Sequence, residues 1–189
     1  MSVPAGPQEP EIVCISSEVA YRNKWMTVRE DRVRRPDGTP GLYGVVDKPD
    51  FALILPFADG GFHLVEQFRY ALGERRWEFP QGSWEQDPAA DPHDLARGEL
   101  REETGLRAKE IELIGYLHNS PGFCSQGFHV FLATGLTEGD QQLEDSEAGL
   151  IHRWFARDEV WELVQQGRLS DAASVAALGL FERLRRPVA

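Results

Sequence analysis

The sequence predicts an α+β fold in which a small antiparallel β unit precedes a larger mixed domain. Short apolar runs separated by turn residues fill the chain from Ile12 to Val46, which is typical of antiparallel strands. Beyond Val46, strands and helices alternate without the strict βαβ rhythm of a doubly wound sheet. The chain has 189 residues, 41% hydrophobic and 27% charged, which is enough to bury a core without disulfides. We expect a flexible tail over 1–10, a β subdomain over 11–47 and the main domain over 48–189.

The β subdomain is predicted from four runs rich in β-branched and aromatic residues. They are Ile12–Ile15, Val19–Tyr21, Met26–Val33 and Leu42–Val46. Between the last two stands Pro36-Asp37-Gly38, a turn signal because glycine adopts positive φ without steric cost. The runs therefore predict a small antiparallel sheet.

In the main domain we expect six strands and three helices. The strands are Phe51–Phe57, Phe62–Tyr70, Arg76–Phe79, Ile111–Tyr116, Phe128–Ala133 and Ile151–Phe155. The helices are Asp94–Thr104, Asp158–Gln166 and Asp171–Leu184, the last with Ser170 as its N-cap. The segment from Leu136 to Glu147 is acidic and irregular.

The first of these helices concentrates negative charge on one face. Glu99, Glu102 and Glu103 stand at i, i+3 and i+4, and Gly105 supplies a left-handed C-terminal cap. Like charges this close destabilise a helix, so a compensating divalent cation with oxygen ligands is the functional interpretation. The alternative is a solvated acidic face.

Composition excludes several classes of function. A net charge of −11 argues against binding to nucleic-acid backbones. No run approaches the ~20 apolar residues of a membrane-spanning helix, and the N-terminal segment lacks the basic and apolar regions of a signal peptide. The two cysteines, Cys14 and Cys124, are far apart and lack metal-ligand spacing. We therefore expect a protein of the reducing cytoplasm.

The stretch from Gly82 to Leu106 resembles the Nudix box. The matching positions of its helical half are Glu99, Leu100, Glu102, Glu103, Gly105 and Leu106. Flanking sequence resembles the ADP-ribose and nucleotide-sugar pyrophosphatase branch at Leu64–Tyr70, Trp77–Pro80, Ser120–Phe123 and Asp171–Ser174. The resemblance covers roughly Ile12 to Leu180 and implies a Nudix-type α/β/α sandwich with a mixed central sheet.

The chain departs from this signature in its loop half. Fifteen residues separate Gly82 from Gly98, two more than in the signature. Gly98 stands where the signature has arginine, and the mid-loop glutamate has no clear counterpart. In the family these two side chains are thought to brace the loop against the helix, so both losses are consistent with one paired change. Glycine inside a helix also costs ~1 kcal/mol relative to alanine.

The resemblance implies a Mg²⁺ cofactor, for which Mn²⁺ is able to substitute. Its ligands are expected to be Glu99 and Glu103, with Glu102 as ligand or catalytic support, and a backbone carbonyl at the Gln81–Gly82 turn. A carboxylate on a late loop is expected to act as base, for which we favour Glu147 over Asp145; a solvated acidic loop is the alternative.

Four further residues are candidates for contacting the substrate. Arg69 follows a strand, and its fork of donors suits a phosphate; a surface arginine is the alternative. Glu78 is expected to hold a substrate hydroxyl or an arginine, and a structural ion pair is equally compatible with the sequence. Trp84 and Phe123 are expected in loops flanking the site, where they contact base or sugar or simply pack.

The resemblance implies hydrolysis of a nucleoside diphosphate-X compound, such as ADP-ribose or a nucleotide sugar, by metal-activated attack of water on phosphorus. An alternative on the same fold is a nucleoside triphosphate or dinucleoside polyphosphate hydrolase. An alternative of another class is a catalytically silent nucleotide sensor, which the change at Gly98 favours and the retained carboxylates disfavour. Close relatives in the branch are dimers, so a homodimer is expected.

Overall fold

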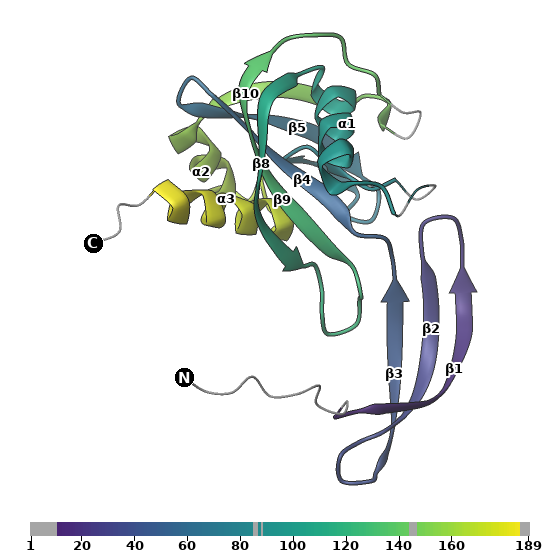
Figure 1. The fold of residues 1–189 in the computed structure, drawn as a ribbon. Helices are drawn as coiled ribbons and strands as arrows, with labels where there is room; N and C mark the ends of the chain where they lie inside the picture. Colours follow the sequence, from purple (N-terminus) through teal and green to yellow (C-terminus); the bar gives the residue numbers. More distant parts are fainter. Residues whose placement is uncertain (1–10, 85–86, 88, 144–146, 186–189) are drawn as a thin grey trace. The chain divides into compact units, whose positions relative to one another are not determined.

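A three-stranded antiparallel sheet forms the first of two structural units in the computed structural model (Figure 1), which describes residues 11–84, 87, 89–143 and 147–185. Its strands are β1 (Val13–Arg22), β2 (Thr27–Arg34) and β3 (Pro40–Asp47), in the order β1-β2-β3. The predicted division of the first strand was wrong, since β1 is continuous. Its pairing with β2 continues through Ser16, Ser17 and Glu18, the polar residues that separate the two predicted runs, and shifts register twice.

Local hydrogen bonds explain the two turns of this sheet. The Asn23 side-chain oxygen accepts from the backbone N–H groups of Trp25 and Met26, both at 2.9 Å. At the second turn Gly38 has a φ of 82°, as the turn signal predicted. The segment Ser120–Gln126 belongs to the same unit, where the Val46 N–H donates to the Phe123 carbonyl at 2.8 Å.

The second unit is built on a mixed sheet. Its strands are β4 (Phe51–Ala58), β5 (Gly61–Arg69), β6 (Glu74–Glu78), β7 (Gln81–Gly82), β8 (Arg107–His118), β9 (Gly127–Thr137) and β10 (Ile151–Ala156). The order is β10-β5-β4-β9-β8, with β6 on β5 and β7 on β4. Only β4 and β9 pair in parallel among these described strands. This confirms the expected mixed sheet.

Helices cover both faces of this sheet (Figure 1), namely α1 (Pro92–Thr104) on one and α2 (Arg157–Gln165) with α3 (Ala172–Arg185) on the other. Alternate side chains of β4 show the division. Leu53 and Leu55 pack in the core that contains α2 and α3 residues, whereas Ala52 and Ile54 pack against α1. The predicted α/β/α layering is confirmed.

Helix α1 starts two residues earlier than predicted. Asp91 is its N-cap, with a carboxylate oxygen that accepts from the His93 N–H at 2.8 Å, and Pro92 takes the first helical position. The helix ends as predicted, because Gly105 adopts a φ of 74° and its N–H donates to the Arg101 carbonyl at 2.9 Å.

The predicted cap of α3 was displaced by one residue. Asp171, rather than Ser170, precedes the helix, and its carboxylate accepts from the Ser174 N–H at 2.8 Å. Both residue types favour this position, so sequence preference alone did not separate them.

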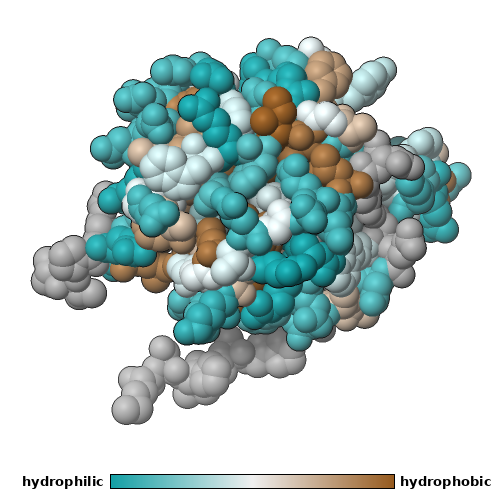
Figure 2. Space-filling model, turned by 90° about the horizontal axis from the view of Figure 1, so that it is seen from above, coloured by the Kyte–Doolittle hydropathy of each residue, from teal (hydrophilic) through white to brown (hydrophobic). Residues whose placement is uncertain are grey.

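The described helices all lack either the length or the apolar character needed to cross a membrane. On the face drawn in Figure 2, hydrophilic residues predominate and hydrophobic residues form small groups. This distribution agrees with the low mean hydropathy of −0.41.

Candidate functional site

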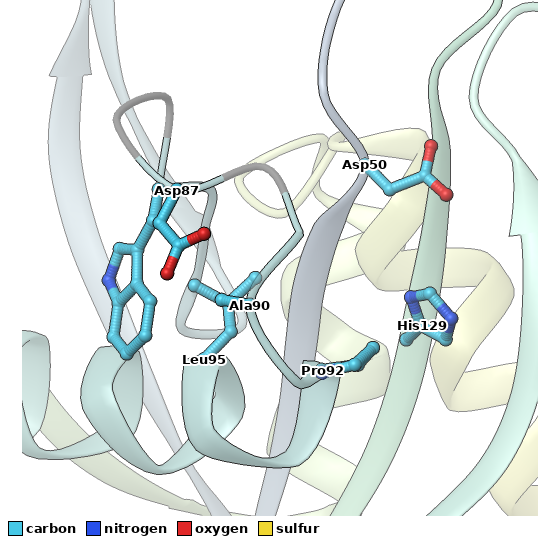
Figure 3. Close-up of a pocket in the computed structure, with 7 residues that line it drawn as sticks. Asp50, Asp87, Ala90, Pro92, Leu95 and His129 are labelled. Atoms are coloured by element: carbon cyan, nitrogen blue, oxygen red, sulfur yellow. The ribbon is translucent and has the colours of Figure 1, made fainter.

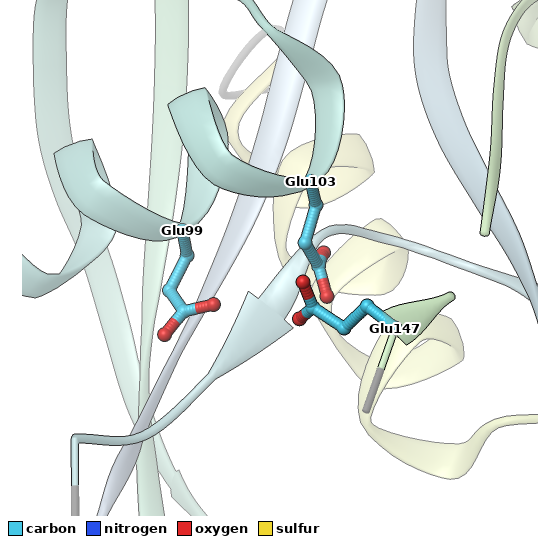
Figure 4. A group of neighbouring side chains, drawn as sticks. All are labelled: Glu99, Glu103 and Glu147. Carbon is cyan, nitrogen blue, oxygen red and sulfur yellow. The ribbon is translucent and has the colours of Figure 1, made fainter. Parts of the chain in front are cut away.

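Three glutamates from two segments of the chain converge at α1 (Figure 4). Glu99 and Glu103 lie on successive turns of that helix, and Glu147 comes from the segment before β10. Each offers a carboxylate oxygen, and the three oxygens lie within 4.8 Å of one another. Glu99 is 5% and Glu103 1% exposed, while Glu147 is half-buried. The cluster is therefore held largely away from water.

Burial and mutual repulsion make this cluster difficult to ionise. Burial raises the pKa of Glu103 well above its ordinary value, and the neighbouring charges of Glu99, Glu147 and Glu78 raise it further. The Gln81 N–H donates to the Glu103 carboxylate at 3.0 Å and acts in the opposite direction. A divalent cation would allow all three carboxylates to be charged together, and hard oxygen donors fit that role.

Gly82 brings the backbone close to these carboxylates. A Cβ atom at this position would lie 2.4 Å from Glu99 Oε2 and 2.6 Å from Glu99 Cδ, so a larger residue would displace the Glu99 side chain. The pairing of Gly82 with Ala52 of β4 fixes this approach. Buried carboxylates beside a close backbone segment fit a small cation with oxygen ligands. Metal ligation by Glu99, Glu103 and the Gln81–Gly82 backbone stays a prediction.

Two other predicted acidic residues have different outcomes. Glu102 lies outside the three-carboxylate group, and its carboxylate pairs with Arg101 at 3.2 Å. Asp145 lies outside the described residues. Their proposed support of catalysis stays a prediction.

Arg69 and Glu78, both predicted to contact the substrate, bind each other. Arg69 Nη2 lies 2.6 Å from Glu78 Oε1 and Arg69 Nε lies 3.1 Å from Oε2, which makes the pair bidentate. Gln67 also donates to Glu78 at 2.7 Å. Burial raises the pKa of Glu78, which is 2% exposed, although the Arg69 guanidinium opposes that shift. The ion-pair alternative for Glu78 is thus observed, while the Arg69 side chain keeps 41% exposure.

Trp84 packs against the unusual glycine of α1. A Cβ atom at Gly98 would lie 2.5 Å from Trp84 Cζ2, so the indole occupies space that any side chain at position 98 would need. This gives the absence of the signature's arginine a physical reason. Among the described residues of the loop, Trp84 contacts the helix at Gly98 through its aromatic ring.

Trp84 also borders a cavity of about 150 Å³ near the start of α1 (Figure 3). Pro92, Leu95 and Glu99 stand at i, i+3 and i+7 on the helix, so the cavity wall and the carboxylate cluster share one helical stripe. The other lining residues are Asp50, Asp87, Ala90 and His129. Phe123, the second predicted aromatic contact, belongs to the first unit, where it is 56% exposed. Substrate contact by either aromatic residue stays a prediction.

Asp171 and Ser174 hold the segment Phe79–Gln81 in place. Neither residue was assigned an individual role from the sequence. The Gln81 side chain donates to Asp171 at 3.2 Å, and the Phe79 N–H donates to Ser174 Oγ at 3.0 Å. Both partners come from the start of α3. The resemblance of Asp171–Ser174 to the pyrophosphatase branch was the available signal, but it did not indicate which segment they contact.

Two family models match consecutive parts of this chain. The NUDIX domain model matches residues 47–178, and the model of the nucleoside diphosphate sugar hydrolase N-terminal domain matches residues 12–46. The ADP-ribose pyrophosphatase of Mycobacterium tuberculosis is 33% identical over 173 residues, covering 90% of this chain and 83% of that protein. The ADP-ribose pyrophosphatase of Bacillus subtilis is 30% identical over 167 residues, covering 87% of this chain and 89% of that protein.

A solved structure of an ADP compounds hydrolase shares the fold. It matches with a TM-score of 0.82 over 95% of this chain and 96% of that one, at 19% sequence identity. The domain model spans well over half of the chain and includes both the acidic helix and Glu147. The chain therefore belongs to the NUDIX family.

Proposed function

We propose that this protein hydrolyses the diphosphate linkage of a nucleoside diphosphate-X compound, such as ADP-ribose or a nucleotide sugar, with Mg²⁺ as cofactor and Mn²⁺ able to substitute. The observation that carries the proposal is the convergence of Glu99, Glu103 and Glu147 within 4.8 Å. Membership of the NUDIX family and similarity to two ADP-ribose pyrophosphatases support the same reaction and substrate class.

When bound, Mg²⁺ neutralises charge on the phosphate oxygens and makes water a better nucleophile at neutral pH. The residues of the chain supply the geometry. Glu99 and Glu103 would hold the cation, and the Gln81 N–H donates to the Glu103 carboxylate at 3.0 Å and so fixes its position. Gly82 lets the backbone approach the Glu99 carboxylate closely, because a Cβ atom there would lie 2.4 Å from Glu99 Oε2.

Glu147 is proposed to accept the proton of the attacking water. It is half-buried and belongs to the carboxylate group, yet it comes from a different segment than the helix ligands. Arg69 is proposed to contact a phosphate group of the diphosphate. Its Nε and Nη2 bond to Glu78, and the side chain stays 41% exposed. In this arrangement Glu78 is a positioning residue, because it acts through Arg69.

A substrate panel tests the proposed reaction. ADP-ribose, nucleoside diphosphate sugars, nucleoside triphosphates and dinucleoside polyphosphates are incubated with Mg²⁺ or Mn²⁺, and the products are identified. We expect two phosphate monoesters from each preferred substrate. Preference for triphosphates would instead favour the alternative hydrolase, and binding without any turnover would favour the nucleotide sensor.

Substitutions in the carboxylate group test the assigned roles. Glu103→Gln should lower kcat by at least ~10²-fold because it removes a metal ligand. Glu147→Gln should slow hydrolysis with little change in substrate affinity, since a base acts in the reaction step. Exposed Glu112 on β8 provides the matched control, Glu112→Gln. Wild-type turnover by Glu103→Gln would reject the site.

We further propose a homodimer that works in the cytoplasm. The exposed apolar side chains of the first unit support self-association, namely Val13, Ile15, Val19, Tyr21, Leu42 and Tyr43. Cys14 and Cys124 are both free thiols, which favours a reducing compartment.

A further inference from the structure

A second cavity lies on the side of α1 that faces away from Glu99. It has a volume of about 260 Å³ and opens between α1 and β8. Arg97, Arg101 and Arg107 line it together with Leu100, Ala108 and Ile111. Arg97 and Arg101 each stand two residues from Glu99, so they point about 160° away from it around the helix. The cavity is therefore distinct from the carboxylate cluster.

Positive charge is concentrated at this cavity in a protein whose net charge is −11. Arg97 and Arg101 are neighbours at i and i+4, an arrangement of like charges that destabilises a helix by a few tenths of a kcal/mol. Within the described residues, the three arginines make one ion pair, between Arg101 and Glu102 at 3.2 Å. The Arg97 guanidinium donates to the Ala108 carbonyl at 3.3 Å, a contact that leaves its charge uncompensated.

The Arg101 side chain is partly open to this cavity. Its Nε is enclosed and lacks a hydrogen-bond partner among the described residues, but the side chain as a whole is 42% exposed and lines the cavity. Its exposed part is therefore available to an anionic ligand. Guanidinium groups bind phosphate oxygens in a fork geometry that lysine does not reproduce.

The dimensions of the cavity decide the class of ligand. A nucleic-acid backbone requires a broad basic face, which an acidic chain with one small cationic cavity does not offer. The apolar floor of Leu100, Ala108 and Ile111 suits the uncharged part of a small organic molecule.

We propose that this cavity binds a small phosphate monoester, with the phosphate between the three arginines and the organic part on the apolar floor. The products of the proposed hydrolysis are phosphate monoesters. A role of the cavity in sensing product therefore depends on the proposed function. Binding itself does not depend on turnover.

Calorimetric titration of the full-length protein tests the proposal. AMP, ribose 5-phosphate, inorganic phosphate and adenosine are titrated in the presence of EDTA, which suppresses metal-dependent phosphate binding at the carboxylate cluster. We expect AMP to bind, adenosine to bind at least about tenfold more weakly, and affinity to fall as salt rises. Comparison of AMP with inorganic phosphate separates an organic ligand from the free anion.

Four variants locate the binding. Arg97→Gln and Arg107→Gln should each weaken AMP binding by about tenfold or more, because each removes a charge-assisted hydrogen bond. Arg183→Gln, at an exposed position on α3, is the matched control and should bind as the wild type does. Glu103→Gln should also retain AMP binding. The proposal is overturned if the Arg97 and Arg107 variants bind AMP normally, or if Glu103→Gln alone abolishes binding.

Turnover is measured separately so that the two proposals fail independently. Arg97→Gln should hydrolyse the preferred substrate at the wild-type initial rate. If the protein hydrolyses nothing yet binds AMP through the arginines, the cavity stands and the proposed function fails. If hydrolysis proceeds but AMP binding is insensitive to both arginine substitutions, the cavity fails alone.

Discussion

At the scale of single residues, the site depends on the close approach of the Gly82 backbone to the Glu99 carboxylate. Glycine here serves proximity rather than unusual backbone geometry, because Gly82 is absent from the glycines with positive φ. The Gly82 backbone can lie this close to Glu99 only because residue 82 has no Cβ atom. A substitution at Gly82 should act through the displaced carboxylate.

Gly82→Ala is predicted to lower kcat by at least about tenfold and to weaken the apparent affinity for Mg²⁺. Its Cβ atom would lie 2.4 Å from Glu99 Oε2, which forces Glu99 out of the carboxylate group. Steady-state rates over a Mg²⁺ titration provide the measurement. Gly179→Ala is the control, since a Cβ atom there meets no other atom within 4 Å. Equal kinetics for the two variants would contradict this account.

Individual site residues were predictable to different extents. Glu99 and Glu103 followed from helical spacing within a specific motif, and the structure places them together. The pairing of Arg69 with Glu78 did not follow, because it depends on the register of β5 against β6, in which Arg69 faces Glu74 and Val65 faces Glu78. The sequence shows which charged side chains are present, but not which of them form ion pairs with one another.

At the scale of structural elements, α1 and its preceding loop form one packed unit through Trp84 and Gly98. The sequence indicated a lost brace because the signature names an arginine at that position. An aromatic ring replaces it with contact rather than charge, and the ring needs position 98 to lack a side chain. The two residues should therefore be energetically coupled.

Gly98→Arg is predicted to destabilise the protein by about 1–3 kcal/mol, because its side chain overlaps Trp84. Trp84→Ala should also destabilise it, since the ring leaves a void beside the helix. In the double variant the arginine occupies that void, so the combined loss should be smaller than the sum of the single losses. Urea denaturation of the four proteins measures this coupling. Strictly additive losses would show that the contact is incidental.

Element boundaries illustrate why local patterns have limits. The C-terminal end of α1 was correct because glycine in the left-handed region is a strong local signal. The N-terminal end was two residues late, since Pro92 was assigned to the loop although proline is favoured at the first helical position. Strand β1 was divided because the polar residues Ser16, Ser17 and Glu18 separate its two apolar runs, whereas pairing with β2 makes the strand continuous.

At the scale of the whole molecule, stability should depend on a pair of histidines on neighbouring strands. His63 Nδ1 lies 2.8 Å from His152 Nε2, between β5 and β10. Burial, together with the charge of His63, lowers the pKa of His152 to about 4. Burial also lowers the pKa of His63, although Glu138 and Asp59 act against that shift.

The histidine pair should contribute less to the free energy of unfolding as the pH falls from 6.5 towards 4. At these two positions the unfolded chain binds more protons than the folded one, so their contribution rises with pH and is complete above 6.5, whereas the raised pKa values of Glu78 and Glu103 act in the opposite direction. The contribution is about 1 kcal/mol after allowance for solvent screening of the partly exposed rings. Urea denaturation at pH 5 and 7.5 measures it. His152→Gln should reduce the difference between these pH values, and an unchanged difference would exclude the pair as its source.

Association through the first unit is a further property of the whole molecule. Leu42, which is 58% exposed on β3, is predicted to lie in the dimer interface. Leu42→Asp should shift the mass measured by light scattering from dimer to monomer, because it places a charge in an apolar contact. Leu184→Asp, at an equally exposed site on α3, should leave the dimer intact. A monomeric wild type, or a dimer unaffected by Leu42→Asp, would contradict the proposed interface.

The parallel pairing of β4 with β9 has a consequence for protein synthesis. Its register joins Phe51 to Phe128, so the pair encloses the entire segment that carries α1, and Glu147 follows still later in the chain. Helix α1 is therefore synthesised before β9, the parallel partner of β4, and before Glu147, the third glutamate of the carboxylate group. A chain terminated before residue 147 carries Glu99 and Glu103 but lacks the third carboxylate of the proposed metal site.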